Sequence, residues 1–143
     1  MVSNYKGPTF AGSPRSDLGI EIRRTVKSSP VLPFARIARK LLGTHYYLSL
    51  VICGDELAKR VNKQYRKKSY SPNVLSFPLG KNEGEIFLNV RAGAREAKKF
   101  GVPLQERIAL LFIHGCLHLK GLRHGRTMDT TEQKTLHDFR IVK

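Results

Sequence analysis

The sequence has few cysteines and no long hydrophobic run, which argues against a disulfide-rich, a membrane-spanning or a secreted protein. Its two cysteines, Cys53 and Cys116, cannot form the framework of a small disulfide-rich domain. No apolar run approaches the ~18 residues that cross a bilayer, and the first 16 residues lack the apolar core of a secretory signal. We therefore expect a cytoplasmic protein that does not enter membranes. Residues 1–16 are predicted to be a flexible basic tail, and residues 17–143 a single domain.

Acidic residues are also scarce. The chain has 11 Asp and Glu against 26 Lys and Arg, so its formal net charge is +15. Residues 1–70 contain 14 of the basic and 4 of the acidic residues. This balance favours a polyanionic partner, with nucleic acid ahead of an anionic membrane surface. A generic basic surface is the alternative, and charge alone gives affinity without sequence specificity.

Hydrophobic periodicity predicts interleaved strands and helices. This pattern indicates an α+β domain in which a small mixed β-sheet packs against several helices. The helix predicted over residues 103–120 contains an almost wholly apolar run at 108–113, which makes it the expected central buried helix. Further helices are predicted over 33–42, from Asp55 as N-cap to about 66–68, over 91–100, and over 129–139 with Asp129 or Thr130 as cap.

Four segments are predicted to be strands. Residues 18–26 have the alternation of an edge strand, and residues 45–53 form a β-type run. Residues 74–77 and 85–89 are predicted to pair as a hairpin, with Pro78 and Gly80 opening the turn. These strands do not alternate with helices in a regular parallel series, which is why we expect a mixed sheet.

Three of the five histidines lie within residues 112–125, FIHGCLHLKGLRHG. His114 and His118 are four residues apart and share one helix face, and Gly121 permits a left-handed helix stop after which His124 can return to the same point. Three neutral imidazoles suit zinc and leave a fourth position open to water, as in catalytic sites. A single histidine on a helix is more often an ordinary surface or core residue, but three at this spacing favour a metal site. Cys116 lies about 200° around the helix from His114 and is predicted to face the core.

The residue after His114 limits the chemistry. Zinc proteases place Glu, their general base, directly after the first histidine of His-Glu-x-x-His, whereas this chain has Gly115. Peptide hydrolysis by that mechanism is therefore disfavoured. A bound metal ion lowers the pKa of its water and polarises phosphoryl oxygens. Together with the net charge of +15, this site indicates phosphodiester hydrolysis of a nucleic acid.

Three blocks of the sequence resemble one known family. HGCLHLKGLRHG is similar to the signature of the YbeY-type rRNA maturation factors, His-Gly-x-Leu-His-Leu-x-Gly-x-Asp-His. Asn62, Tyr65 and Arg66, followed by NVLSFP, resemble a second family segment, and GEIFLN is similar to the family's Gly-Asp-Ile strand. The blocks occur in the family's order, and the resemblance covers about residues 18–140.

The resemblance implies a specific function. The expected activity is that of a zinc-dependent, single-strand-specific endoribonuclease acting in rRNA maturation, at the 3′ end of the 16S rRNA, and in ribosome quality control. The family's ligands correspond to His114, His118 and His124, which would hold one Zn²⁺ per chain. Its functional arginine corresponds to Arg66, so we assign catalytic roles to Arg66 and His114. The expected partners are ribosomal RNA and the small ribosomal subunit, with no small-molecule cofactor, and the assigned RNA-binding residues are Arg66, Lys67, Lys68 and Arg123.

The chain departs from the family pattern at three positions. Arg123 replaces the Asp before the last histidine, Glu85 replaces the Asp of Gly-Asp-Ile, and Pro72 stands where the family usually has Thr. Arginine cannot accept a proton, so the water would be activated by zinc alone or by Glu85 or Asp138. Arg123 favours an alternative function, a non-catalytic ribosome-assembly factor with structural zinc. A third hypothesis is a metallohydrolase with another substrate.

Overall fold

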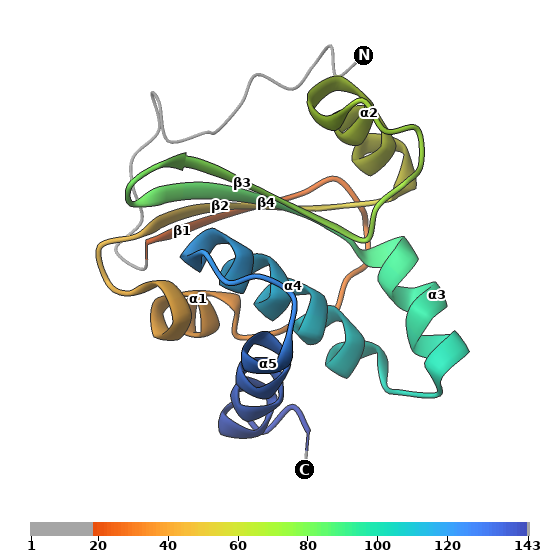
Figure 1. The fold of residues 1–143 in the computed structure, drawn as a ribbon. Coiled ribbons are helices and arrows are strands. Elements are labelled where there is room, and N and C mark those ends of the chain that lie inside the picture. The colour runs from red at the N-terminus through yellow and green to blue at the C-terminus, as the bar shows by residue number, and fades with distance from the viewer. Residues whose placement is uncertain (1–18, 143) are drawn as a thin grey trace.

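The computed structural model describes residues 19–142, and the tail predicted for residues 1–16 lies outside them. The described chain forms a four-stranded sheet and five helices, which confirms the predicted α+β domain (Figure 1). In chain order the elements are β1 (Ile20–Arg24), α1 (Phe34–Leu42), β2 (Tyr47–Cys53), α2 (Asp55–Arg66), β3 (Val74–Gly80), β4 (Glu83–Asn89), α3 (Val90–Phe100), α4 (Leu104–Lys120) and α5 (Arg126–Asp138).

The strands follow the order β1-β2-β4-β3. β2 pairs in parallel with β1 and β4, whereas β3 runs antiparallel to β4, so the sheet is mixed as predicted. The edge position of β1 and the β3–β4 hairpin are also confirmed. Pro78 and Gly80 were expected to open the turn, and this was wrong because both belong to β3, which has a register shift between them. An edge strand tolerates this, since the missing N–H of Pro78 is not needed by an outer neighbour.

Helices cover both faces of the sheet. α2 lies on one face, and α4 lies directly against the other, with α1 and α3 on either side of α4 and α5 beyond it (Figure 1). The alternation of β4 fits this arrangement, because Ile86 and Leu88 join the core around α4 while Phe87 packs with Val61 of α2. α4 is therefore the predicted central buried helix. No helix among the described residues is long and apolar enough to cross a membrane.

A glycine lets α4 approach the sheet closely. A Cβ at Gly115 would lie 3.0 Å from the Ser76 hydroxyl and 3.2 Å from the side chains of Ile86 and Val74. The Ser76 hydroxyl also donates a hydrogen bond to the Gly115 carbonyl at 3.0 Å. The residue that excludes the protease base therefore has a packing role, and it holds the neighbouring His114 beside β3.

Two predicted helix starts need correction. Asp55 is the first residue of α2, and Gly54 occupies the N-cap position. The Asp55 carboxylate instead accepts hydrogen bonds from Arg95 at 2.8 Å and Asn89 at 2.9 Å. The Arg95 bonds, followed by the Asn89 bond, lower the pKa of Asp55 to about 2. This carboxylate ties α2 to α3 and is not available to cap its own helix.

The last helix starts earlier than expected. α5 begins at Arg126, and its N-cap is Gly125, so neither Asp129 nor Thr130 caps it. Met128 is only 1% exposed and packs the first turn of α5 into the core. Burial of this turn, which a search for a polar cap does not reveal, sets where α5 begins.

Candidate active site

The three predicted ligands lie together in the structure. The Nε2 atoms of His114 and His118, one turn apart on α4, are 3.0 Å from each other. His124 comes from the loop after α4, and one ligand nitrogen from each of the three residues lies within 4.8 Å of the other two. Among the described residues, this is the group of histidine, cysteine and carboxylate side chains able to hold a metal ion.

The turn after α4 follows the predicted path. Gly121 has φ 102°, in the left-handed region, and its N–H donates to the His118 carbonyl at 3.0 Å. The N–H of Leu122 donates to the Leu117 carbonyl at 3.0 Å, which completes the helix end. The chain then doubles back, and His124 reaches the two helical histidines. Cys116 is fully buried in the core, as predicted.

The arrangement fits a zinc-type ion. A tetrahedral ion ~2.0–2.1 Å from each imidazole nitrogen would place the nitrogens about 3.3 Å apart, close to the observed His114–His118 separation. Burial, followed by the proximity of His114 and His124, lowers the pKa of His118. This shift favours the neutral ring, which is the form that coordinates metals.

A carboxylate that sequence reasoning missed lies behind the histidines. Glu132 of α5 is 7% exposed, and its Oε2 accepts a hydrogen bond from Nδ1 of His114 at 2.6 Å. This bond leaves Nε2 of His114 directed at the other histidines, the orientation that carboxylates impose on metal-bound imidazoles. The signal was a four-residue spacing: Met128, Glu132 and Leu136 form one buried stripe. Starting the predicted helix at residue 129 removed Met128 and hid this pattern.

The histidines open onto a cavity of about 830 Å³, here called the histidine cavity. Its walls come from the segment before and within β3, from α4, from α5 and from the end of α2. Arg66 and Arg107 supply positive charge, whereas Glu132 supplies the carboxylate. The full lining consists of Arg66, Asn73, Val74, Leu75, Ser76, Phe77, Arg107, Leu110, Leu111, His114, His118, His124 and Glu132.

The two acids considered as general bases lie elsewhere. Glu85 projects from β4 on the α2 side, where its Oε2 accepts a hydrogen bond from Ser49 at 2.9 Å. Burial raises the pKa of Glu85 to about 8. Asp138 pairs with Lys134 at 2.8 Å near the end of α5. Neither acid lines the histidine cavity.

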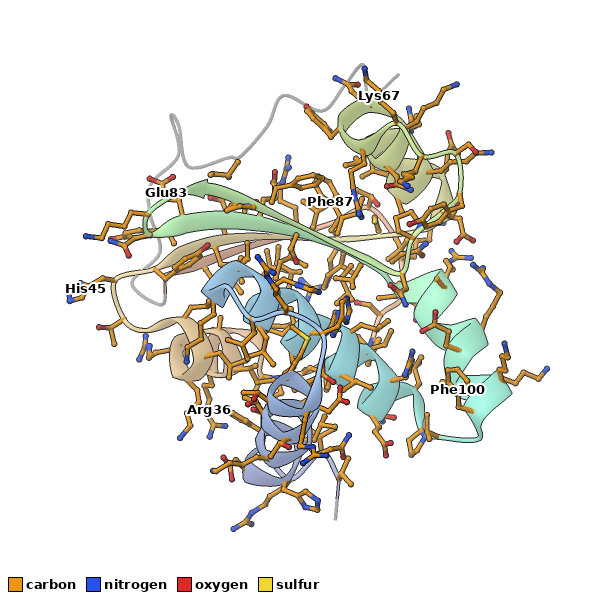
Figure 2. All side chains as sticks on the ribbon, viewed as in Figure 1. Arg36, His45, Lys67, Glu83, Phe87 and Phe100 are labelled. Atoms are coloured by element: carbon orange, nitrogen blue, oxygen red, sulfur yellow. The ribbon has the colours of Figure 1, made fainter. Side chains whose placement is uncertain are left out.

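The predicted RNA-binding cations are distributed unevenly. Arg66 lines the histidine cavity, so the structure brings it together with the three histidines. Lys67 and Lys68 are exposed beyond it, and Figure 2 shows Lys67 at the outer end of α2. Arg123 is exposed next to His124 and does not line the cavity. Arg107, which does line it, was not identified from the sequence.

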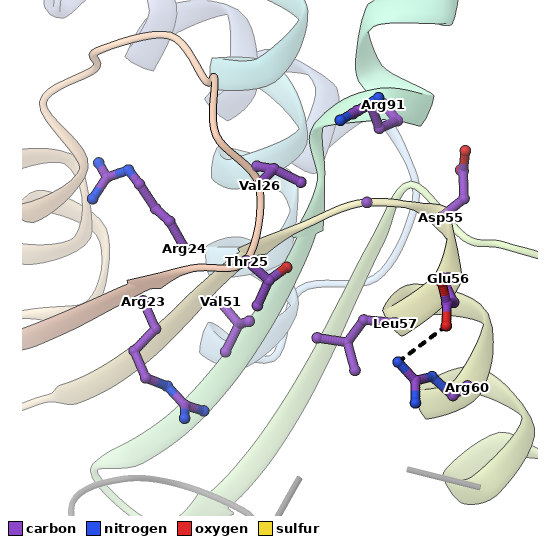
Figure 3. A pocket seen from close by; sticks show the side chains of 11 residues that line it. Arg23, Arg24, Thr25, Val26, Val51, Asp55, Glu56, Leu57, Arg60 and Arg91 are labelled. Atoms are coloured by element: carbon purple, nitrogen blue, oxygen red, sulfur yellow. Dashed lines mark ion pairs between the residues drawn. The ribbon is translucent and has the colours of Figure 1, made fainter. Parts of the chain in front are cut away.

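A separate cavity of about 730 Å³ lies between the end of β1 and the start of α2 (Figure 3). Its lining includes Arg23, Arg60 and Arg91 around the apolar side chains of Val51 and Leu57. Arg60 pairs with Glu56 of the same helix at 3.4 Å. Its described lining contains no histidine or cysteine, and the group of side chains able to hold a metal ion lies at the histidine cavity instead.

The fold and the histidine cavity define an α+β domain with a metal-type three-histidine centre at a cavity that two arginines border. The sequence profile described as Endoribonuclease YbeY matches residues 23–140, and the chain belongs to this family. The predicted family is thereby confirmed.

Individual relatives agree with this family. The chain is 36% identical over 115 residues to "Endoribonuclease YbeY" of Helicobacter pylori strain J99, covering 78% of this chain and 81% of that one. It is 33% identical over 111 residues to "Endoribonuclease YbeY" of Aquifex aeolicus, covering 73% and 74%. A solution structure of a Thermotoga maritima protein aligns with TM-score 0.65 at 22% identity, over 85% of this chain and 92% of that one. That likeness confirms the fold.

Proposed function

We propose that this protein is a zinc-dependent endoribonuclease that cleaves single-stranded RNA. The observation that carries the proposal is the convergence of His114, His118 and His124 at a cavity that Arg66 borders, in a chain of the YbeY endoribonuclease family. A zinc ion held by the three imidazoles would supply a water of lowered pKa and a Lewis acid for a phosphoryl oxygen.

The residues of the chain have separate roles in this mechanism. Arg66 binds the scissile phosphate through its planar fork of donors and stabilises the charge that develops there. Glu132 acts on His114 and not on the substrate, because its carboxylate fixes the imidazole through Nδ1. His114 is therefore both a ligand and the point at which the protein orients the centre. Lys67, Lys68 and Arg123 attract the RNA backbone from outside the cavity.

The physiological substrate that we propose is ribosomal RNA. The net charge of +15 supports a large polyanion as partner, since each neutralised phosphate releases counterions and strengthens binding. We assign the protein to cytoplasmic maturation of the 3′ end of 16S rRNA and to quality control of the small ribosomal subunit, following the resemblance of its motifs.

The test measures cleavage of a single-stranded rRNA fragment by zinc-loaded protein. His114→Ala should abolish cleavage, because it removes a ligand. Arg66→Ala should lower kcat about 10²–10³-fold, the cost of losing one donor to a developing charge. His45→Ala and Arg39→Ala change exposed residues outside the cavity and should cleave as wild type does. Unchanged cleavage by either cavity variant contradicts the proposal.

A second candidate is a non-catalytic assembly factor in which zinc has a structural role. This candidate is favoured because the described lining of the histidine cavity offers no free carboxylate as a general base. Its carboxylate, Glu132, is already bonded to His114. Arg123 in place of an acid points the same way. Under this hypothesis the chelator EDTA would unfold the protein, and the zinc-loaded form would bind rRNA without cleaving it.

A further inference from the structure

A smaller cavity adjoins the histidine cavity. It has a volume of about 380 Å³ and lies between the loop after α2 and the exposed side of α3. Arg66, Asn73 and Val74 line both cavities, so the two are neighbours that meet at Arg66. We call it the Tyr70 cavity, after the aromatic residue in its lining.

Tyr70 is an exposed ring on a firmly held loop. The residue is 56% exposed, yet its carbonyl accepts a hydrogen bond from the side chain of the buried Asn62 at 3.0 Å. The next residue, Ser71, donates from its hydroxyl to the Asp55 carbonyl at 3.2 Å. Asn89, also buried, donates from its side chain to the Pro72 carbonyl at 3.0 Å. Three consecutive residues are thus anchored, so binding does not have to order the backbone of this loop.

The charges around Tyr70 favour an anion. Glu96, the carboxylate of this lining, already accepts hydrogen bonds from Arg107 at 2.8 Å and Asn73 at 3.0 Å, so its charge is compensated. Arg95 is held by Asp55 and is also compensated. Arg66 and Lys99 remain, and among the described residues neither forms an ion pair with a carboxylate. The Lys99 ammonium lies 5.7 Å from the centroid of the Phe100 ring, a contact that leaves its positive charge in place.

An exposed ring beside two cations without carboxylate partners has the chemistry of a nucleotide site. Unpaired bases stack on aromatic side chains, while Arg and Lys hold the phosphates, and this combination is sequence-tolerant because every base has a π-face. A base within a duplex could not reach the ring. The arrangement therefore selects single strands.

We propose that the Tyr70 cavity binds one unpaired nucleotide adjoining the phosphate that is cleaved. Its base stacks on Tyr70, and its phosphate lies between Lys99 and Arg66, the residue shared with the histidine cavity. This assignment rests on the proposed endoribonuclease function, for which it supplies a positioning site. It also gives a physical cause for single-strand specificity.

The test measures binding separately from cleavage. Fluorescence anisotropy with a 2′-O-methylated single-stranded oligonucleotide, checked to be intact afterwards, gives Kd for the full chain. Tyr70→Ala should raise Kd about tenfold, the effect of losing one stacked base, whereas Tyr70→Phe should stay within about twofold of wild type. An oligonucleotide with abasic sites should bind wild type and Tyr70→Ala equally. Equal affinity of wild type and Tyr70→Ala for the base-containing strand would overturn the proposal.

The charge contribution has its own control pair. Lys99→Gln should reduce the slope of log Kd against log salt by about 0.7, the value for one lost contact to a single-strand phosphate. Lys40→Gln removes an exposed lysine from α1, outside both cavities, and should leave the slope unchanged. Equal slopes for the two variants count against the phosphate position. Weaker binding by Tyr70→Ala in a protein that cleaves no RNA supports the subsite and overturns only the proposed function.

Discussion

A carboxylate is buried on each side of the sheet, and the two differ in the group that donates a hydrogen bond to them. On the α2 face, Glu85 is 2% exposed, and its hydrogen-bond partner is the neutral hydroxyl of Ser49. On the α4 face, Glu132 is 7% exposed and accepts its hydrogen bond from the His114 ring. A buried carboxylate beside a hydroxyl gains little compensation for its charge, whereas one beside an imidazole can orient a ligand. Burial alone therefore does not distinguish the two acids; their hydrogen-bond partners do.

The largest effect that we expect concerns Glu85. Its pKa of about 8 in the folded protein exceeds the ordinary value of 4.5, so the folded state binds an extra proton between these values. The stability that Glu85 contributes is therefore fully present below about pH 4.5 and is lost as pH rises to about 8. At about 1.4 kcal/mol per pKa unit, the loss is on the order of 3–5 kcal/mol. Glu85→Gln should remove this contribution to the pH dependence of the unfolding free energy, measured by urea unfolding from pH 5 to 8.5.

A surface acid provides the control for Glu85. The Glu56 side chain is 87% exposed, so Glu56→Gln should keep the pH slope of wild type. If Glu85→Gln also kept that slope, the hydroxyl of Ser49 would compensate the buried charge of Glu85, and the contrast between the faces would fail.

This contrast also shows where sequence reasoning stops. Local signals predicted the histidine cluster, because the spacing of His114 and His118 and the glycine at 121 act within a few residues. The same holds for the α4 core and the β3–β4 hairpin. Glu132 was missed because its role depends on α5 packing against α4, a contact 18 residues away in sequence. Glu85 was considered for the site because sequence alone does not tell which face of the sheet a β4 residue occupies.

An intermediate effect is expected from Glu132. Glu132→Gln keeps the shape of the side chain but weakens its bond to Nδ1 of His114, so zinc affinity should fall about 10–100-fold. Competition with a chromophoric chelator measures this affinity. Glu85→Gln serves as the matched control, because it changes a buried carboxylate on the other face and should bind zinc as wild type does. Equal zinc affinities for the two variants would show that Glu132 does not orient the ligand.

The smallest effect compares the ends of the two helices that cover the faces. α4 ends at Gly121 with φ 102°, and α2 ends at Lys67 with φ 57°, so both use the left-handed region. A residue with a Cβ pays about 1–2 kcal/mol there, and the greater unfolded-state entropy of glycine offsets about 0.5–1 kcal/mol. Lys67→Gly should therefore stabilise the protein by up to ~1 kcal/mol in urea unfolding. Lys68→Gly, at a position without positive φ, should not increase the free energy of unfolding.

The reverse substitution completes this comparison. Gly121→Ala should destabilise the protein by up to ~1 kcal/mol, since nothing lies within 4 Å of the added Cβ and the lower unfolded-state entropy of alanine offsets part of the backbone cost. If Lys67→Gly were neutral, the end of α2 would not be strained. The two helix ends would then differ in more than residue type. If Lys67→Gly raises stability and Gly121→Ala lowers it, α2 and α4 both end at a left-handed residue that favours glycine. The sequence has glycine at this position only in α4, the helix that carries His114 and His118.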